Sequence, residues 1–166
     1  MIKVIIGFSH SKSPFAIGSK IIASAENRSY SHVHVQLSDS EIGREMVYQA
    51  SNGFVNCLTL EAFTQIHEIV KEYILMATDS EYWDMIIFLK SSLGAPYSRA
   101  QMIAIAIKKL LGVQLNISNK DSAFICSELG ARVCQCLKIP VNESVDFVTP
   151  SDLDKILSDN KIQVRN

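Results

Sequence analysis

The chain has 166 residues and 48% of them are hydrophobic, which predicts a single folded domain over residues 1–166 and excludes extensive disorder. Lys and Arg total 16 against 17 Asp and Glu, and the resulting net charge of −1 gives no electrostatic basis for binding nucleic acid. Four cysteines are too few for a disulfide scaffold, and neither a signal-peptide pattern nor an apolar run long enough for a membrane span is present, which indicates reduced thiols in the cytoplasm.

The first half of the chain is predicted to be mainly β-structure. Residues 30–37 alternate strictly between apolar and polar side chains, which predicts a strand with one apolar face and with His32 and His34 on the other face. Along this half, the predicted elements are strands at 2–8, 30–37, 45–50, 54–58 and 70–77, and short helices at 17–25 and 61–67.

The second half is predicted to be mainly helical. Helices are expected at 81–93, 99–111, 121–137 and 150–158, followed by a last strand at 162–164. Asp79 or Ser80 is expected to cap the first of these helices, Asp121 or Ser122 the third, and Thr149 the fourth. Because the strands come mostly before the helices, the fold class is predicted to be α+β, with an antiparallel sheet packed against helices.

One predicted helix carries a candidate nucleophile. Cys126 would lie in the first turn of the helix at 121–137, where free backbone N–H groups and the helix dipole stabilise a thiolate. Gly130 would lie one turn later on the same face, which suits the close approach of another backbone or of a substrate. From the pattern alone, however, a lone cysteine at a helix start is more often a small buried hydrophobic residue.

A cysteine nucleophile needs an imidazole within hydrogen-bond reach. His32 and His34 share the polar face of their strand about 7 Å apart, so only one of them is expected to meet the sulfur. Gln49 on the neighbouring strand would orient the ring, or Tyr48 if the register is shifted by one residue. The remaining cysteines and histidines are expected in ordinary structural places. Cys57, Cys134 and Cys136 are expected in the core, His67 at the surface or its boundary, and His10 in a turn that is either solvated or at the rim of the site.

Five short segments occur in an order typical of one enzyme family. They are Ser31–Val33, Val47–Ala50, Gly94–Tyr97, Cys126–Leu129 and Val148–Leu153. Together they resemble the circularly permuted papain-like amidases of the NlpC superfamily, and the YiiX/YaeF-like branch in particular. The resemblance covers almost the whole chain. It implies a papain-like fold in which the histidine strand precedes the cysteine helix in the sequence.

The resemblance also implies residue roles. Cys126 falls at the position of the family's nucleophile, and His32 at that of its general base and acid. Gln49 falls at the third catalytic position, where many members resemble a strand that ends in Glu-Ala, so this chain has a polar but uncharged group there. Tyr97 falls where a tyrosine lines the oxyanion pocket in such enzymes.

Two neighbouring residues complete the expected site. His34 replaces the small residue usual after the Ser-His-Val start and is expected to crowd or extend the cleft, and Ser127 follows the nucleophile. The implied activity is hydrolysis of an amide, such as a cell-wall peptide or isopeptide bond, through a thioester and without a metal or organic cofactor. Hydrolysis or transfer of a lipid acyl group, a non-catalytic binding module and an assembly protein of a virus or cell envelope are the alternatives.

Overall fold

The computed structural model describes residues 1–13, 29–51, 53–98, 123–141 and 144–165. Its strands are β1 (Ile2–Ser11), β2 (His32–Asp39), β3 (Arg44–Ser51), β4 (Phe54–Thr59), β5 (His67–Ala77) and β6 (Gln163–Arg165). Its helices are α2 (Leu60–Ile66), α3 (Asp79–Ser92), α5 (Cys126–Cys136), the 3₁₀ turn η1 (Val145–Phe147) and α6 (Pro150–Asp159). The predicted helices at 17–25 and 99–111 lie outside the described residues.

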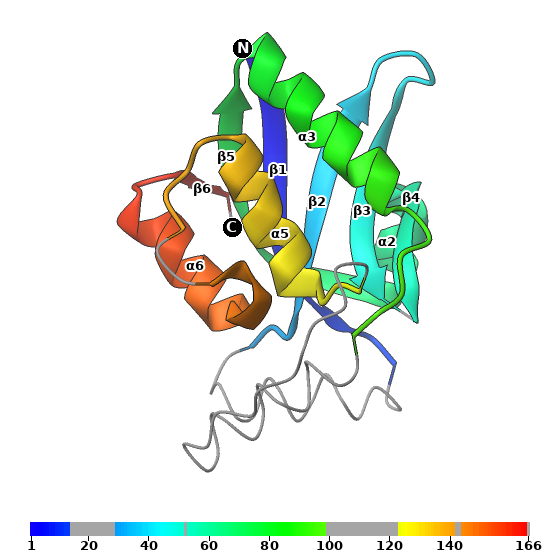
Figure 1. Cartoon of the computed structure of the whole chain (residues 1–166). Coiled ribbons are helices and arrows are strands. Elements are labelled where there is room, and N and C mark those ends of the chain that lie inside the picture. The colour runs from blue at the N-terminus through cyan, green and yellow to red at the C-terminus, as the bar shows by residue number, and fades with distance from the viewer. Residues whose placement is uncertain (14–28, 52, 99–122, 142–143, 166) are drawn as a thin grey trace.

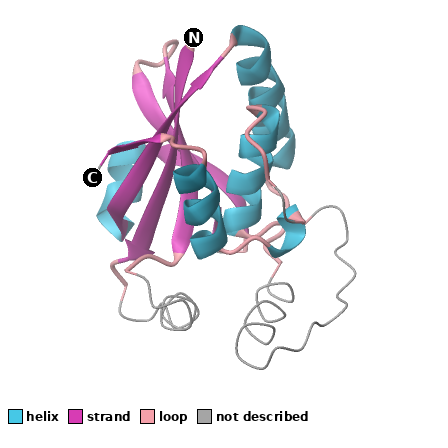
Figure 2. Cartoon of the chain, turned by 90° about the vertical axis from the view of Figure 1, so that its left-hand side faces the viewer, coloured by secondary structure: helices cyan, strands magenta, loops and turns pink. Residues whose placement is uncertain are grey.

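The described strands form one six-stranded sheet in the order β4-β3-β2-β1-β5-β6, and each neighbouring pair is antiparallel (Figure 1). Helices α3, α5 and α6 cover one face of this sheet, and α2 covers the other (Figure 2). We call these the helical face and the α2 face. The predicted α+β class with an antiparallel sheet is therefore confirmed.

The main core lies between the sheet and the helical layer. Strand β2 shows how the sequence builds it: Val33, Val35 and Leu37 are buried in this core, as the alternating pattern predicted. The core is not confined to one face, because Phe63 of α2 is also fully buried, on the opposite side of the sheet. The sheet is therefore covered on both faces at the level of β2.

Helices α3 and α6 both begin with a capping box, and the sequence predicted the cap of α6 but not that of α3. Thr149 caps α6, with Pro150 in the first turn and the Asp152 side chain bonded back to the cap, as expected. For α3 the predicted cap was wrong by one residue. Thr78 accepts the N–H of Glu81 while the Glu81 carboxylate accepts the N–H of Thr78, and this reciprocal pair outcompetes the other short polar side chains.

Helix α5 begins later than the pattern predicted. Cys126 is its first residue and Ile125 its N-cap, with no side-chain cap hydrogen bond. Phe124 is extended instead, because it pairs with Tyr97 in a parallel bridge and donates its N–H to the carbonyl of Pro96. The predicted caps at 121 and 122 lie outside the described residues. Within the described part of the chain, no helix is long and apolar enough to cross a membrane.

Candidate active site at the starts of α5 and β2

Cys126 is a buried cysteine in thiol form at the first position of α5, with an exposed fraction of 5%. The helix is held close to the sheet at Gly130. A Cβ atom on this glycine would lie 2.9 Å from Cγ1 of Val33 and 2.8 Å from Cδ2 of Leu153, both tighter than ordinary contacts. The expected close approach at Gly130 is therefore to β2 and α6, and it brings Cys126 to the end of the sheet where β2 begins (Figure 1).

The other three thiols have environments that favour protonation. Burial raises the pKa of Cys134 to about 12, and burial also raises the pKa values of Cys57 and Cys136. Cys134 is fully buried in the core, as predicted, while the other two are half-buried. At neutral pH all three are expected to be thiols rather than thiolates, and therefore poor nucleophiles.

His32 and Gln49 are joined directly, as the candidate site requires. Nε2 of His32 lies 2.7 Å from Oε1 of Gln49, and the amide nitrogen of Gln49 bonds to Oδ1 of Asn56 at 3.3 Å. This amide orientation makes the histidine Nε2–H the donor, so the neutral ring carries its free lone pair on Nδ1. Tyr48, the alternative partner, lies on the other side of the sheet in the main core, paired with Val35.

The ring of His32 is kept neutral by its surroundings. Burial lowers its pKa most, the nearby His67 lowers it further, and the hydrogen bond to Gln49 opposes both, so that the pKa falls to about 3. A neutral amide cannot stabilise an imidazolium as a carboxylate would. The arrangement therefore provides a well-oriented base that is unprotonated at neutral pH.

A stack of aromatic rings lies on the α2 face beside His32. Its ring centroid is 5.0 Å from that of His67 with an interplanar angle of 19°, and His67 stacks on Phe63 at 4.4 Å and 11°. The surface or boundary position predicted for His67 was wrong, because only 7% of the residue is exposed and it is buried under α2. Strand β5 begins three residues earlier than predicted, and α2 folds back over it, which turns this histidine inward.

His32 and Cys126 start elements that cover different sides of the sheet. Val33 contacts α5, and because neighbouring strand residues point to opposite faces, His32 leaves the sheet on the α2 face, where its stacking partners lie. Both residues are nonetheless at the same end of the molecule, the lower end in Figure 1. A contact between them would have to pass around the end of β2, and the pairing of Cys126 with His32 stays a prediction.

The three expected oxyanion and substrate residues occupy different environments. Tyr97 lies near Cys126. Burial raises the pKa of its phenol most, and the nearby thiol of Cys126 raises it further. The hydroxyl of Ser127 is buried and donates to the carbonyl of Val148 at 2.6 Å, so it is engaged within the fold. His34 is fully buried with its ring 4.4 Å from Phe63, which places it beneath α2 and not at the surface of a cleft.

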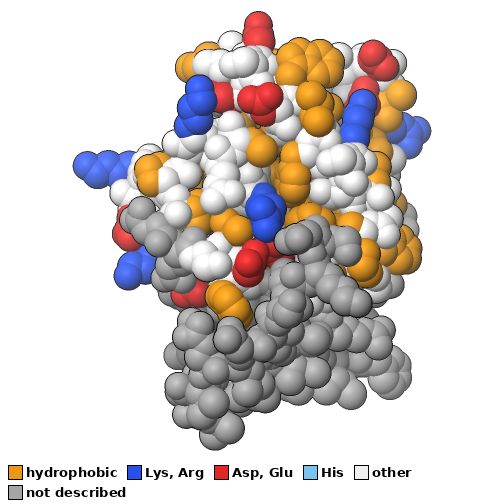
Figure 3. Space-filling model, in the orientation of Figure 1, with side chains coloured by type: hydrophobic (Ala, Val, Ile, Leu, Met, Phe, Trp, Pro, Cys, Tyr) orange, Lys and Arg blue, Asp and Glu red, His pale blue; other side chains and the backbone are white. Residues whose placement is uncertain are grey.

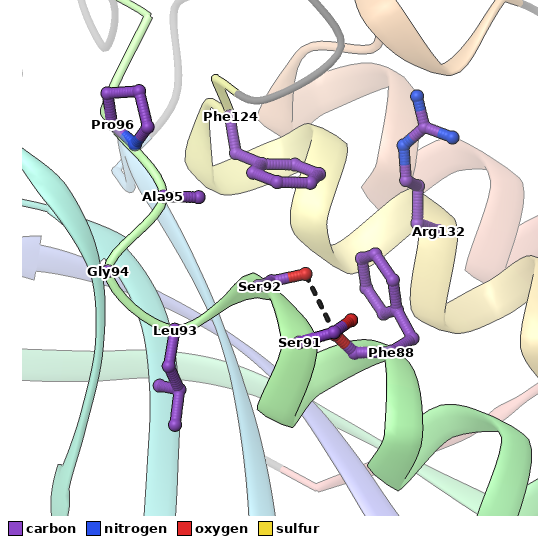
Figure 4. A pocket seen from close by; sticks show the side chains of 9 residues that line it. All are labelled: Phe88, Ser91, Ser92, Leu93, Gly94, Ala95, Pro96, Phe124 and Arg132. Carbon is purple, nitrogen blue, oxygen red and sulfur yellow. Dashed lines mark hydrogen bonds between the residues drawn. The ribbon is translucent and has the colours of Figure 1, made fainter.

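A cavity of about 650 Å³ lies between the end of α3 and the start of α5. It is lined by Phe88, Ser91, Ser92, Leu93, Gly94, Ala95, Pro96, Phe124 and Arg132 (Figure 4). The rings of Phe88 and Phe124 meet edge to face at 6.0 Å, and Arg132 is paired with Glu128 and Asp146 at 3.1 and 3.2 Å. The cavity therefore has a mixed lining, with two aromatic rings, two serines and a charge-paired arginine, and Phe124 in this lining lies two residues before Cys126.

The surface over the helical face carries no single dominant charge among its described residues. Lys and Arg side chains are interspersed with Asp and Glu side chains over α3, α5 and α6 (Figure 3). This agrees with the nearly balanced composition of the chain.

A buried cluster around Asp154 was missed from the sequence. The carboxylate of this α6 residue accepts hydrogen bonds from the hydroxyls of Tyr30 and Tyr73 and from Nζ of Lys71, each at 2.6 Å. The four residues are up to 124 positions apart, so no local pattern identifies them. The cluster ties α6 to β5 and to the segment that leads into β2.

Comparisons with known proteins show a similar fold. The solved structure of the metalloprotein yiiX from Escherichia coli O157:H7 is similar to this chain with a TM-score of 0.54 and 16% sequence identity, covering 100% of this chain and 96% of that one. No known family profile matches the sequence, and no curated protein matches it significantly. At this identity the likeness concerns the fold, and it agrees with the YiiX-like resemblance of the motifs.

Proposed function

We propose that the protein is a cysteine hydrolase with the permuted papain-like arrangement of the NlpC superfamily. In this proposal Cys126 attacks the carbonyl carbon of an amide, such as a cell-wall peptide or isopeptide bond. The observation that carries it is the 2.7 Å hydrogen bond between His32 and Gln49, at the end of the sheet where Cys126 begins α5. The yiiX-like fold and the ordered motifs support the same assignment.

The reaction would proceed by acyl transfer. As the sulfur of Cys126 bonds to the carbonyl carbon, its proton passes to Nδ1 of His32. The imidazolium then gives that proton to the departing amine, which leaves a thioester on the sulfur. Water, deprotonated by the same imidazole, hydrolyses the thioester and restores the thiol. In this mechanism Gln49 holds the imidazole ring of His32 so that the lone pair on Nδ1 can accept the proton.

The oxyanion formed during attack needs donors. The backbone N–H of Cys126 lies in the first turn of α5, where such groups have no partner within the helix, and the hydroxyl of Tyr97 is nearby. Each correctly placed donor would stabilise the transition state by about 3 kcal/mol. The raised pKa of Tyr97 keeps its hydroxyl protonated and able to donate.

A metal is not used in this proposal. The structural neighbour is described as a metalloprotein, but among the described residues of this chain no group of three or more His, Cys, Asp and Glu side chains is arranged to hold a metal ion. The proposal assigns the chemistry to the thiol and the imidazole, and a reducing setting such as the cytoplasm would keep the thiol available.

The cavity beside α5 is proposed to receive part of the substrate. Phe88 and Phe124 would contact an apolar side chain or an acyl chain next to the cleaved bond. A small peptide is the preferred substrate, and a lipid amide or ester is the alternative, since the two phenylalanine rings could contact an apolar group of either. Release of a cleaved peptide or of a fatty acid, read by mass spectrometry, distinguishes the two.

One observation favours a second function, that of a binding module without catalysis. The imidazole of His32 has a pKa of about 3 and no carboxylate partner, so it is a weak base. A protein with the same fold that only binds a peptide or acyl compound would need no stronger base. Such a module would bind its ligand equally well after Cys126→Ala and would turn over no acyl substrate.

The proposal is tested by the relative reactivity of the four thiols. Iodoacetamide is expected to modify Cys126 about tenfold faster than Cys57, Cys134 or Cys136, because only this thiol has a helix start to stabilise its thiolate. Peptide mapping by mass spectrometry reads each site separately.

The variants His32→Ala and His10→Ala provide the matched comparison. His32→Ala should slow the modification of Cys126, whereas His10→Ala removes an imidazole from the rim and should leave the rate unchanged. Equal modification of all four thiols, or a rate at Cys126 that is the same in His32→Ala, would contradict the proposal.

A further inference from the structure

We infer that His67 is a positioning residue that fixes the plane of the His32 ring from the α2 face. The inference rests on the proposed function, in which His32 is the general base. The sequence pattern predicts a surface or boundary position for His67 and no role in the site. The structure instead buries it in direct stacking contact with the candidate base.

The three rings restrict His32 in a way that its hydrogen bond cannot. The interplanar angle is 11° between Phe63 and His67, 19° between His67 and His32, and 27° between His32 and Phe63. The three ring planes are therefore nearly parallel. A single hydrogen bond at Nε2 to Gln49 still allows the imidazole to tilt about that bond. Stacking on His67 removes this freedom, because a tilted ring would lose contact on one side. The direction of the Nδ1 lone pair is thereby fixed.

His67 is itself held from two sides. It is the C-cap of α2, and its backbone N–H donates to the carbonyl of Phe63. It is also the first residue of β5, where it pairs with Ser11 of β1. A helix end and a strand pair therefore fix the backbone that presents the ring, which is the rigid support that a positioning residue requires.

The charged and titratable groups around this stack come from four strands. His34 lies beside His32 on β2, His10 lies on β1 with Glu68 of β5 3.4 Å away, and Glu72 of β5 is bonded to Arg165 of β6 at 2.6 Å. Burial and then the nearby His10 lower the pKa of His67, and His67 in turn lowers that of His32. A first proton on His67 would repel a second on His32, which keeps the candidate base uncharged.

The test observes the His32 ring directly by ¹⁵N NMR of the full chain, with the alkylation rate of Cys126 as a second readout. His67→Gln removes both ring and charge, and it is expected to raise the pKa of His32 by about one unit and to slow alkylation about tenfold. His67→Phe keeps a flat ring in the stack, so it should retain the Nε2–H tautomer and most of the alkylation rate.

His10→Gln is the graded comparison, because it removes an imidazole that lies beside Glu68 and lowers the pKa of His67 but leaves the stacked ring of His67 in place. It should leave the alkylation rate unchanged and shift the His32 signals much less than His67→Gln does. Unchanged His32 signals and an unchanged alkylation rate in His67→Gln would overturn the inference. A different result counts against the proposed function: an alkylation rate of Cys126 that is the same in His32→Ala as in the wild type. In that case the NMR signals of His32 in His67→Gln still decide whether stacking positions the ring.

Discussion

The buried side chain of His34 is expected to lower the stability of the fold. The side chain is fully buried, and within the part of the chain that the structure describes neither ring nitrogen has a hydrogen-bond partner. Burial lowers its pKa well below the usual value, and the neighbouring His32 and His67 lower it further. The ring is neutral, and its two unbonded nitrogens carry a desolvation cost that an apolar side chain would avoid.

Replacing His34 is therefore expected to stabilise the protein. His34→Leu, of similar size, should raise the free energy of unfolding by about 1–2 kcal/mol, because it removes buried polar atoms that form no hydrogen bond. Urea denaturation measures the change. His34→Ala is the control for lost packing against Phe63 and should be destabilising. If His34→Leu lowered stability as much as His34→Ala, the imidazole would have to contribute a favourable interaction.

At the scale of single elements, the packing of α5 on β2 depends on Gly130. A Cβ atom there would meet Val33 and Leu153, both fully buried, at less than 3.0 Å. Gly130→Ala is expected to lower the free energy of unfolding by about 1–3 kcal/mol, because overpacking outweighs the better helix propensity of alanine.

Thermal unfolding of Gly130→Ala and of Gln135→Ala, at an exposed position of the same helix, gives the comparison. The control should change stability by less than about 0.5 kcal/mol. A stabilised Gly130→Ala protein would show that α5 does not lie as close to β2 as described.

The Asp154 cluster joins α6 to the sheet by charge-assisted hydrogen bonds. Burial alone would raise the pKa of Asp154, but the bonds from Lys71, Tyr30 and Tyr73 outweigh it and hold the pKa below its usual value. Asp154→Asn would leave the Lys71 ammonium without its charged partner. We expect a loss of about 3 kcal/mol of stability, measured by urea denaturation.

Tyr73→Phe is the graded comparison for this cluster. It removes one hydrogen-bond donor to Asp154 and leaves the ion pair with Lys71, so a loss of about 1 kcal/mol is expected. Similar losses for Asp154→Asn and Tyr73→Phe would mean that the ion pair contributes little to holding α6.

For the whole molecule, the buried histidines predict sensitivity to acid. The pKa values of His32, His34 and His67 are lowered, chiefly by burial, so the unfolded chain binds more protons than the folded protein as the pH falls below about 6.5. Stability should therefore decrease from pH 6.5 downwards, with a limiting slope of about 1.4 kcal/mol per pH unit for each histidine that stays neutral in the fold.

Urea midpoints between pH 7 and pH 4 measure this dependence. His34→Leu is expected to reduce the slope, because it removes one of the three groups, whereas the wild-type slope should continue towards the pKa of His32 at about 3. Constant stability between pH 7 and pH 5 would show that these histidines are accessible to protons in the folded state.

Features set by local pattern could be predicted from the sequence. The alternation through Val33 and Val35 correctly gave the core face of β2, and Thr149 with Pro150 gave the start of α6. The choice of Gln49 over Tyr48 required the strand register, because a shift of one residue moves every side chain to the opposite face.

Features set by contacts between distant segments could not be predicted. His67 is buried because α2 folds back over β5, and Asp154 meets partners from two other parts of the chain. The late start of α5 likewise follows from the pairing of Phe124 with Tyr97, which no local propensity encodes. A cap or a periodicity is local, whereas these arrangements depend on tertiary packing.

The central proposal, that the sulfur of Cys126 meets Nδ1 of His32 around the end of β2, is tested most directly by following the ¹⁵N signals of His32 while Cys126 is alkylated. Nδ1 should shift strongly as the sulfur is modified, while Nε2, held by Gln49, should shift less and the signals of His10 should not move. Complete modification of Cys126 with unchanged His32 signals would contradict the account.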